Sequence, residues 1–337
     1  MILTLKSGVN KKGIDDVLRK IKKLKLKAHL SRGAEKVIIG VIGPNAAVHR
    51  SQFEGIDEIE IVTAISKPYK LVSREFKKAD TVIDVRGVKI GGPALVVIAG
   101  PCSVEKKESL FEIANSVKRA GARVLRGGAF KPRTSPYQFQ GLGHKALRWM
   151  KEARAMTGLP FITEALDPRH VRSIAAYADI IQIGARNAQN TFLLKEVGKA
   201  KKPVMLKRGM AMKIEEWLLA AEYIASQGNQ RIILCERGIR SFDSSTRFTL
   251  DLTAVPLLKK LTHLPVFVDP SHGVGVRDLI PAMSRAAIAA GADGLIVEVH
   301  DSPTEALSDG AQALLPSQFA LMVDDLRRVA GALGRSL

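Results

Sequence analysis

The feature that most constrains the fold is a series of eight short apolar segments separated by amphipathic helical patterns. The segments occupy residues 95–99, 124–127, 161–164, 180–183, 204–207, 232–235, 266–269 and 295–299. Each is nearly continuous in apolar residues, which is typical of strands buried on both faces of a parallel sheet. Between them, apolar residues recur at the spacing of a helix face. Eight such alternations predict an α/β fold, a (β/α)8 TIM barrel; an open doubly wound sheet is the alternative.

The first 66 residues follow a different order of elements. They read as strand, helix, strand, strand, helix, strand, with Ile14, Val17 and Ile21 on one face of the first helix. The second helix is expected at residues 46–53 and the last strand at 59–65. This order is typical of a ferredoxin-like βαββαβ domain.

Proline and glycine mark the junctions between the parts of the chain. Lys67-Pro68 interrupts the last strand of the first part, and a hairpin with strands at 81–85 and 88–90 follows. We therefore expect a ferredoxin-like regulatory domain at residues 1–66, a linker and β-hairpin at 67–92, and a catalytic barrel at 93–337. The last part matches the roughly 250 residues typical of such barrels.

Composition and charge indicate where the protein is found and which kinds of partner it binds. No apolar run reaches the length of a membrane span and the first residues do not resemble a signal peptide, so we expect a cytoplasmic protein without a membrane partner. Its formal net charge of +19 favours anionic partners. Nucleic acid is the weaker candidate, because the chain lacks zinc-finger spacing and an aromatic RNA-binding strand.

Polar and charged residues follow the predicted strands. In a barrel, the residues just after each strand meet at one mouth, where active sites are built. Six cations fall at these positions: Arg126, Lys131, Arg133, Arg186, Lys207 and Arg237. Together they suit two phosphates, or a phosphate and a carboxylate. The alternative is that some of them form structural ion pairs with acidic residues of the barrel.

A second group at the same mouth combines one thiol, one imidazole and two carboxylates. Its members are Cys102, His272, Glu298 and Asp309. They follow the first, seventh and eighth strands, which become neighbours when a barrel closes. Mixed sulfur, nitrogen and oxygen donors suit a divalent Mn, Fe, Co or Zn ion. The alternative is a small buried cysteine and a hydrogen-bonded histidine; Cys235, inside a strand, is expected in the core.

Six motifs at these strand ends, in order along the chain, resemble the 3-deoxy-D-arabino-heptulosonate 7-phosphate (DAHP) synthase family. They are Gly-Pro-Cys-Ser at 100–103, Leu-Arg-Gly-Gly-Ala-Phe-Lys-Pro-Arg-Thr-Ser-Pro at 125–136, Ile-Gly-Ala-Arg-Asn at 183–187, Leu-Lys-Arg-Gly at 206–209, Cys-Glu-Arg-Gly at 235–238 and Asp-Pro-Ser-His at 269–272. The resemblance covers essentially the whole chain, including the ferredoxin-like module of the type I-beta form. It implies metal-dependent condensation of phosphoenolpyruvate with D-erythrose 4-phosphate and water, the first step of the shikimate pathway to aromatic amino acids.

The resemblance also implies roles for individual residues. Phosphoenolpyruvate would be held by Arg126, Lys131, Arg186, Lys207 and Arg237. The loop with Arg133 and Thr134 would take the sugar phosphate, and Asp269 is also assigned to substrate binding. The divalent metal ligands would be Cys102, His272, Glu298 and Asp309. Two further roles come from the chemistry of this reaction and not from the resemblance. Lys131 is expected to donate a proton to the forming alkoxide, and Glu164, at the end of the third strand, is the hypothesised residue that positions or deprotonates the attacking water.

Three other activities are weighed against this one. The related 3-deoxy-manno-octulosonate 8-phosphate synthases take arabinose 5-phosphate and typically carry Lys-Ala-Asn-Arg-Ser where this chain has Lys-Pro-Arg-Thr at 131–134, which favours the four-carbon sugar. A Schiff-base aldolase would use Lys207 as a covalent nucleophile. A nucleic-acid binder would bind with steeply salt-dependent affinity.

The first domain carries no convincing catalytic set. The resemblance implies that it binds tyrosine or phenylalanine as an inhibitor between subunits of a tetramer, with His29 and Ser31 at effector-contact positions. The alternative is that these two residues are ordinary polar positions.

Overall fold

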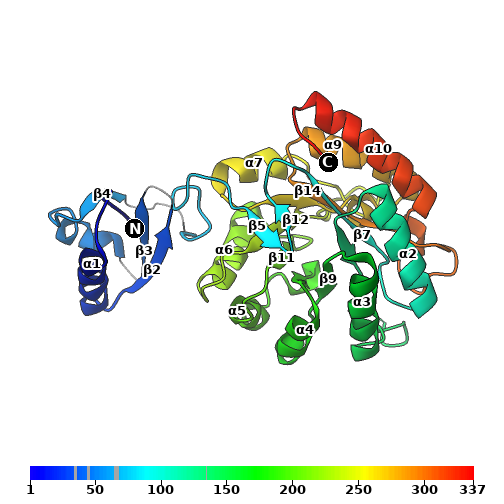
Figure 1. Cartoon of the computed structure of the whole chain (residues 1–337), viewed down its shortest axis with the longest axis horizontal. Coiled ribbons are helices and arrows are strands. Elements are labelled where there is room, and N and C mark those ends of the chain that lie inside the picture. The colour runs from blue at the N-terminus through cyan, green and yellow to red at the C-terminus, as the bar shows by residue number, and fades with distance from the viewer. Residues whose placement is uncertain (34–35, 44–45, 64–67, 134) are drawn as a thin grey trace. The chain divides into compact units, whose positions relative to one another are not determined.

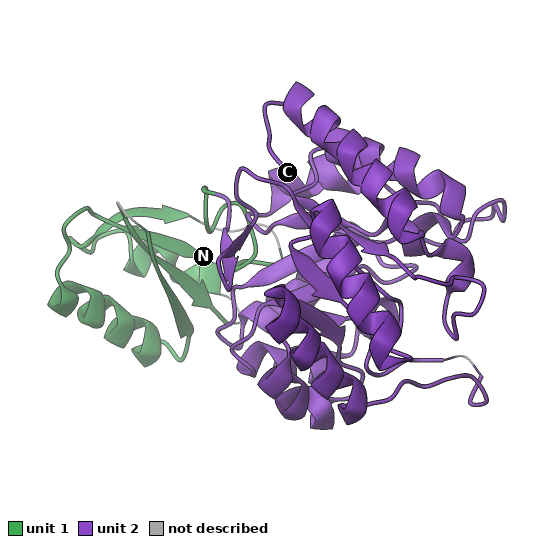
Figure 2. Cartoon of the chain, turned by 45° about the vertical axis from the view of Figure 1, so that its right-hand side comes forward, with its two compact units in different colours: residues 1–79 green, residues 80–337 purple. Residues whose placement is uncertain are grey.

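The computed structural model describes residues 1–33, 36–43, 46–63, 68–133 and 135–337. The chain divides into two compact units, residues 1–79 and 80–337, coloured separately in Figure 2. The expected boundary at residue 66 lies in a stretch outside the described residues. No helix among the described residues combines the length and apolar character that a membrane crossing requires.

Unit 1 is a four-stranded antiparallel sheet covered by one long helix. Its elements are β1 (Ile2–Leu5), α1 (Lys11–Lys23), β2 (Lys27–Arg32), β3 (Val37–Ile42), the 3-10 helix η1 (Ala46–Gln52) and β4 (Ile59–Thr63). The strand order β2-β3-β1-β4 is that of a ferredoxin-like fold, which confirms the prediction. The second helix differs from the expected type, because a seven-residue segment is short enough to wind as a 3-10 helix.

The core of unit 1 lies between α1 and the sheet. Ile14, Val17 and Ile21 project from one face of α1 and pack against strand residues such as Leu3 and Ile39. The helix begins where the Asn10 side chain accepts a hydrogen bond from the Gly13 amide at 3.0 Å.

Unit 2 is a closed eight-stranded parallel barrel surrounded by helices (Figure 1). Its strands are β7 (Val96–Gly100), β8 (Val124–Arg126), β9 (Phe161–Glu164), β10 (Ile180–Ile183), β11 (Val204–Lys207), β12 (Ile232–Glu236), β13 (Val266–Val268) and β14 (Gly294–Glu298). The predicted barrel is confirmed, and each strand lies within one residue of its expected bounds. Pairing of β14 with β7, with Glu298 opposite Gly100, closes the cylinder.

Helices separate successive strands and form the outer layer. They are α2 (Lys107–Ala120), α3 (His144–Thr157), α4 (Val171–Tyr177), α5 (Thr191–Lys199), α6 (Ile214–Ala225), α7 (Ala254–Leu261), α9 (Ile280–Ala289) and α10 (Pro316–Ala332). A short helix, α8 (Pro270–Val274), follows β13 directly, and 3-10 turns lie at Pro168–His170, Ala185–Asn187, Arg277–Leu279 and Gly310–Gln312.

A two-stranded hairpin, β5 (Ile83–Val85) and β6 (Val88–Ile90), precedes the barrel. Arg86 and Gly87 turn it with positive φ angles of 51° and 86°, as a type I′ turn requires. All four of its buried apolar residues belong to the same core cluster as Val96, Cys235 and other barrel residues. The hairpin is therefore part of the barrel core, not a free linker.

Candidate active site

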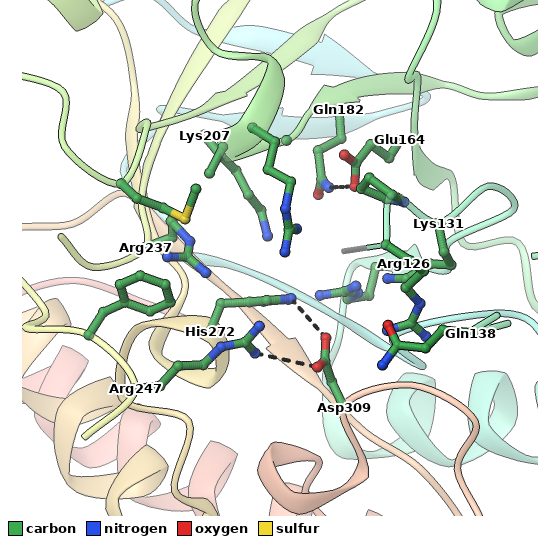
Figure 3. Close-up of a pocket in the computed structure, with 17 residues that line it drawn as sticks. Arg126, Lys131, Gln138, Glu164, Gln182, Lys207, Arg237, Arg247, His272 and Asp309 are labelled. Atoms are coloured by element: carbon green, nitrogen blue, oxygen red, sulfur yellow. Dashed lines mark hydrogen bonds and ion pairs between the residues drawn. The ribbon is translucent and has the colours of Figure 1, made fainter. Parts of the chain in front are cut away.

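The carboxyl ends of the barrel strands surround a cavity of about 250 Å³ (Figure 3). We call it the cationic pocket. The residues that line it include Arg126, Lys131, Arg133, Glu164, Gln182, Arg186, Lys207, Arg237, Arg247, His272 and Asp309. All six cations singled out in the sequence therefore reach one cavity. This convergence follows from the barrel, which aims residues after every strand at the same mouth.

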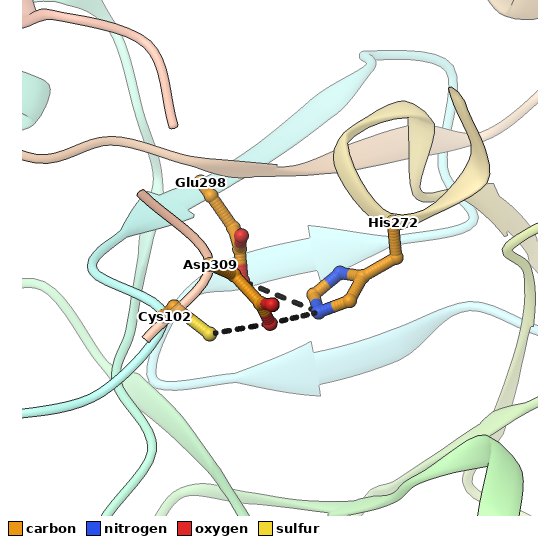
Figure 4. A group of neighbouring side chains, drawn as sticks. All are labelled: Cys102, His272, Glu298 and Asp309. Carbon is orange, nitrogen blue, oxygen red and sulfur yellow. Dashed lines mark hydrogen bonds and ion pairs between the residues drawn. The ribbon is translucent and has the colours of Figure 1, made fainter. Parts of the chain in front are cut away.

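Cys102, His272, Glu298 and Asp309, here named the Cys–His–Glu–Asp cluster, meet beside this pocket (Figure 4). One donor atom from each lies within 4.8 Å of the others. The Cys102 Sγ is 3.3 Å from Asp309 Oδ2, and the His272 Nε2 is 3.3 Å from Glu298 Oε1. Closure of β14 onto β7 brings Glu298 and Cys102 together, because Glu298 pairs with Gly100.

The protonation states of His272 and Asp309 fit a divalent cation. Burial lowers the pKa of His272, which leaves a neutral imidazole able to ligate. Burial alone would raise the pKa of Asp309, but His272, Arg247 and Lys131 outweigh it and bring the pKa to about 2. Among the described residues, Glu298 Oε1 is buried with no hydrogen-bond donor. A cation between these donors would satisfy that oxygen.

Two guanidinium groups of the pocket keep donors without partners. Within the described part of the chain, Arg126 Nε and Nη1 and Arg237 Nη1 are buried and make no hydrogen bond. Arg126 does approach Glu298, at 3.2 Å, and Arg237 stacks 4.1 Å from the Phe248 ring. Buried donors of this kind are costly unless a ligand pairs with them. They favour an oxyanion bound in the pocket.

Lys131 joins the pocket to the cluster. Its Nζ donates to the Cys102 Sγ at 3.0 Å and to the Cys102 carbonyl at 3.2 Å. Burial alone would lower the pKa of Lys131, but Cys102 and Glu298 outweigh it and the pKa is raised. The ammonium is therefore charged and available as a proton donor.

Asp269 lies beneath the pocket and contacts two of its residues. Its Oδ2 pairs with the Lys207 Nζ and lies 2.7 Å from the His272 Nδ1. The side chain is fully buried and is absent from the described lining of the cavity. It therefore contacts Lys207 and His272 from below the cavity, and its expected part in substrate binding stays a prediction.

The loop assigned to the sugar phosphate begins at Lys131 and turns back at Gln140, whose carbonyl accepts from the Lys131 amide. Arg133 lines the pocket but also donates to the carbonyls of Phe139, at 2.9 Å, and Leu307, at 3.1 Å. Thr134 lies outside the described residues.

Glu164 lies across the pocket from Asp309 (Figure 3). Its Oε2 accepts a hydrogen bond from the Gln182 Nε2 at 3.1 Å. Gly184 leaves it room, because a Cβ at that position would lie 2.1 Å from the Glu164 Oε1. The glycine at the end of β10 is therefore part of how the carboxylate is placed.

The remaining candidate residues belong to unit 1 and to the barrel core. His29 and Ser31 belong to β2, the edge strand of the unit 1 sheet, and burial lowers the pKa of His29. The His29 ring packs against Phe76 with centroids 6.1 Å apart. Cys235 is in the barrel core, as expected.

Sequence reasoning missed Gln312, Arg247 and Ser308. Gln312 donates to Glu298 Oε2 at 2.6 Å, Arg247 contacts Asp309 at 3.4 Å, and the Ser308 hydroxyl lies 3.2 Å from the Cys102 Sγ. Arg247 follows the sixth barrel strand and so carried a positional signal. For Gln312 and Ser308, the only signal in the sequence is that they lie within three residues of Asp309.

A (β/α)8 barrel whose mouth combines unpaired guanidinium donors with a Cys–His–Glu–Asp cluster defines an enzyme that acts on small anionic substrates. The chain belongs to the DAHP synthetase I family, whose model matches residues 70–330. The DAHP synthase ferredoxin-like domain matches residues 1–67. These matches confirm the resemblance seen in the strand-end motifs.

Individual relatives agree with the family assignment. The phospho-2-dehydro-3-deoxyheptonate aldolase of Thermotoga maritima is 53% identical over 334 residues, covering 99% of each chain. A crystal structure of the DAHP synthase of that organism superposes with a TM-score of 0.80, covering 99% of this chain and 98% of that one. The 2-dehydro-3-deoxyphosphooctonate aldolase of Koribacter versatilis is more distant, at 33% identity over 68% of this chain and 89% of its own.

Proposed function

We propose that this enzyme condenses phosphoenolpyruvate with D-erythrose 4-phosphate and water, giving 3-deoxy-D-arabino-heptulosonate 7-phosphate and inorganic phosphate. In the shikimate pathway this reaction is the first step toward aromatic amino acids. The observation that supports it best is the set of unpaired Arg126 and Arg237 donors beside the Cys–His–Glu–Asp cluster. The unpaired arginine donors suit the phosphate and carboxylate of phosphoenolpyruvate. The Cys–His–Glu–Asp cluster suits a metal ion that polarises the sugar aldehyde.

Binding of the two substrates divides between two sets of cations. Arg126, Lys131, Arg186, Lys207 and Arg237 are assigned to phosphoenolpyruvate, whose phosphate and carboxylate need several donors. Arg133 and Thr134 are assigned to the sugar phosphate. Because Arg133 now donates to two backbone carbonyls, sugar binding would require it to exchange at least one of them for a phosphate oxygen.

The Cys–His–Glu–Asp cluster is assigned to a divalent ion of the Mn, Fe, Co or Zn type. When bound, such an ion supplies Lewis-acid polarisation of the aldehyde carbonyl. Asp269 fixes the tautomer of His272, because its Oδ2 accepts from Nδ1 and leaves Nε2 toward the cluster. The free thiol of Cys102 also fits a reducing cytoplasm.

The chain's own residues handle the protons. Carbon 3 of phosphoenolpyruvate forms the new bond to the aldehyde carbon, and the Lys131 ammonium donates a proton to the resulting alkoxide. Water adds at carbon 2 and gives one proton to Glu164. The bond from carbon 2 to the phosphate oxygen then breaks, the phosphate leaves with the electron pair and takes up the remaining hydroxyl proton, and carbon 2 becomes a ketone. The released phosphate leaves through the cationic pocket.

The test is an assay of purified protein with phosphoenolpyruvate and each sugar phosphate in turn. We expect phosphate release with erythrose 4-phosphate, loss of activity on chelation and recovery with added metal. Turnover with arabinose 5-phosphate alone would instead identify an octulosonate synthase. Borohydride added with both substrates should leave Lys207 unmodified, because its ammonium is paired with Asp269.

We further propose that unit 1 is a regulatory domain that binds tyrosine or phenylalanine near His29 and Ser31, between subunits of a tetramer. The match of residues 1–67 to the family's ferredoxin-like domain supports a conserved module separate from the catalytic barrel.

A further inference from the structure

The turn after β14, residues 308–312, contacts the Cys–His–Glu–Asp cluster through more than its own ligand. Asp309 is a member of the cluster, and three residues later the Gln312 side chain reaches Glu298. The Gln312 Nε2 donates to the Glu298 Oε2 at 2.6 Å. Only 3% of Gln312 is exposed. A buried side-chain amide is stable only when both its nitrogen and its oxygen have hydrogen-bond partners. The partner of the Gln312 oxygen therefore shows how the amide is held.

The second end of the Gln312 amide is held by Arg247. The Arg247 Nη1 donates to the Gln312 Oε1 at 2.6 Å and lies 3.4 Å from the Asp309 Oδ1. A guanidinium can only donate, and an ionised Glu298 can only accept. The amide oxygen must therefore face Arg247 and the amide nitrogen must face Glu298.

Contacts with helix α8 hold Arg247 where it can reach the Gln312 amide. Its backbone amide donates to the Val274 carbonyl at 2.9 Å, which ties the loop after β12 to helix α8, the helix that carries His272. Gly275 gives its side chain room, because a Cβ there would lie 2.5 Å from the Arg247 Cβ. Arg247 thus spans from the histidine helix to the turn that carries Asp309.

The consequence falls on the two oxygens of Glu298. Oε2 accepts from the Gln312 amide. Oε1 accepts no hydrogen bond among the described residues, but it lies 3.2 Å from the Arg126 Nη2, as an ion pair, and 3.3 Å from the His272 Nε2. The carboxylate is therefore held in one rotation, with Oε1 on the side of His272, a member of the cluster.

We propose that Gln312, oriented by Arg247, is a positioning residue that fixes Glu298 so that Oε1 alone serves as its metal ligand. The inference rests on the proposed metal site and adds two residues to it. Outer partners of this kind typically change metal affinity by about 10- to 100-fold when removed.

The experiment measures Co(II) affinity of the full chain from the thiolate-to-cobalt absorption band. Gln312→Leu should weaken Co(II) binding by about 10- to 100-fold, with the thiolate band still reached at saturation because Cys102 is retained. Arg247→Leu should weaken binding in the same direction, and Arg247→Lys should restore most of it. The double variant Gln312→Leu/Arg247→Leu should lose less Co(II) binding free energy than the two single variants together, because Arg247 acts in part through Gln312.

Arg240→Leu is the matched control, since Arg240 lies on the same loop and is exposed; it should bind Co(II) as the parent does. Wild-type affinity in Gln312→Leu, equal losses in Arg240→Leu and Arg247→Leu, or strictly additive losses would overturn the inference. If Gln312→Leu does not fold, the Arg247 variants decide it, because Arg247 is 34% exposed. If the parent protein shows no Cys102-dependent absorption band with Co(II), the proposed metal site itself is wrong. That result differs from a normal band in the parent with unchanged affinity in Gln312→Leu, which would overturn only the role of Gln312.

Discussion

Cys102 is a protonated thiol in the folded chain at neutral pH. Burial raises its pKa to about 12, with Glu298 and Asp309 adding to the shift and Lys131 and Arg126 opposing it. A metal ligand must be the thiolate, so ion binding has to expel one proton.

We therefore predict that metal affinity rises by about tenfold per pH unit between pH 7 and 8.5. In this range the lowered pKa of His272 keeps its imidazole neutral, so the proton comes from Cys102. Co(II) titrations at several pH values, with proton release followed in weak buffer, check this. Cys102→Ser should bind weakly and release no proton from this position; equal affinity at pH 7 and 8.5 would contradict the assignment.

Glu164 gives a second prediction at this scale. Glu164→Gln should lower kcat by about 100-fold or more, the usual size of general base catalysis. Gly184→Ala should also lower kcat, because its methyl group would displace the Glu164 carboxylate while leaving it in the chain. Steady-state kinetics of both single variants and the double variant measure this. The double variant should be no slower than Glu164→Gln, and full turnover in Glu164→Gln would remove the proposed role.

At the residue scale, sequence could predict ionisable residues that follow a strand. The position after a strand and the residue type together place Arg126, Lys207 and His272 at one mouth. It could not predict Gln312, because a neutral amide has no spacing pattern and its role depends on a 2.6 Å contact across the turn. Sequence also does not show the depth at which each residue lies, so it could not predict that Asp269 pairs with Lys207 and His272.

At the scale of elements, the β5–β6 hairpin should contribute to the stability of the barrel, because its buried residues share the barrel core. Ile90 is fully buried in the core cluster that it shares with the barrel. Ile90→Ala should therefore lower the free energy of unfolding by about 2–5 kcal/mol. Urea unfolding followed by circular dichroism measures it. Lys89→Ala, one residue away and exposed, should change stability by no more than about 1 kcal/mol; equal effects would place the hairpin outside the core.

Elements were predictable to the extent that their apolar pattern was regular. Barrel strands buried on both faces are nearly all apolar, so their bounds could be predicted closely. The segment at residues 46–52 has only a short pattern, and a 3-10 helix and an α-helix of that length differ mainly in backbone hydrogen bonding, which sequence does not show.

At the scale of the whole molecule, the two units should be separable. Removal of residues 1–66 should retain turnover within a few-fold and abolish inhibition by tyrosine or phenylalanine. A solved truncated form of the Thermotoga maritima synthase, which covers 80% of this chain with a TM-score of 0.75, supports such a design. Initial rates with and without each amino acid, for the full and shortened proteins, provide the measurement. Loss of both activity and solubility would indicate a structural role for unit 1.

The Cys–His–Glu–Asp cluster draws its members from the first and the last two barrel strands, across the seam where β14 meets β7. The ribosome synthesises Cys102 about two hundred residues before Asp309, so the nascent chain lacks part of the Cys–His–Glu–Asp cluster for most of its synthesis. If these four residues hold the proposed metal ion, only a chain whose barrel has closed can bind it, and a prematurely terminated product that lacks Asp309 would be inactive.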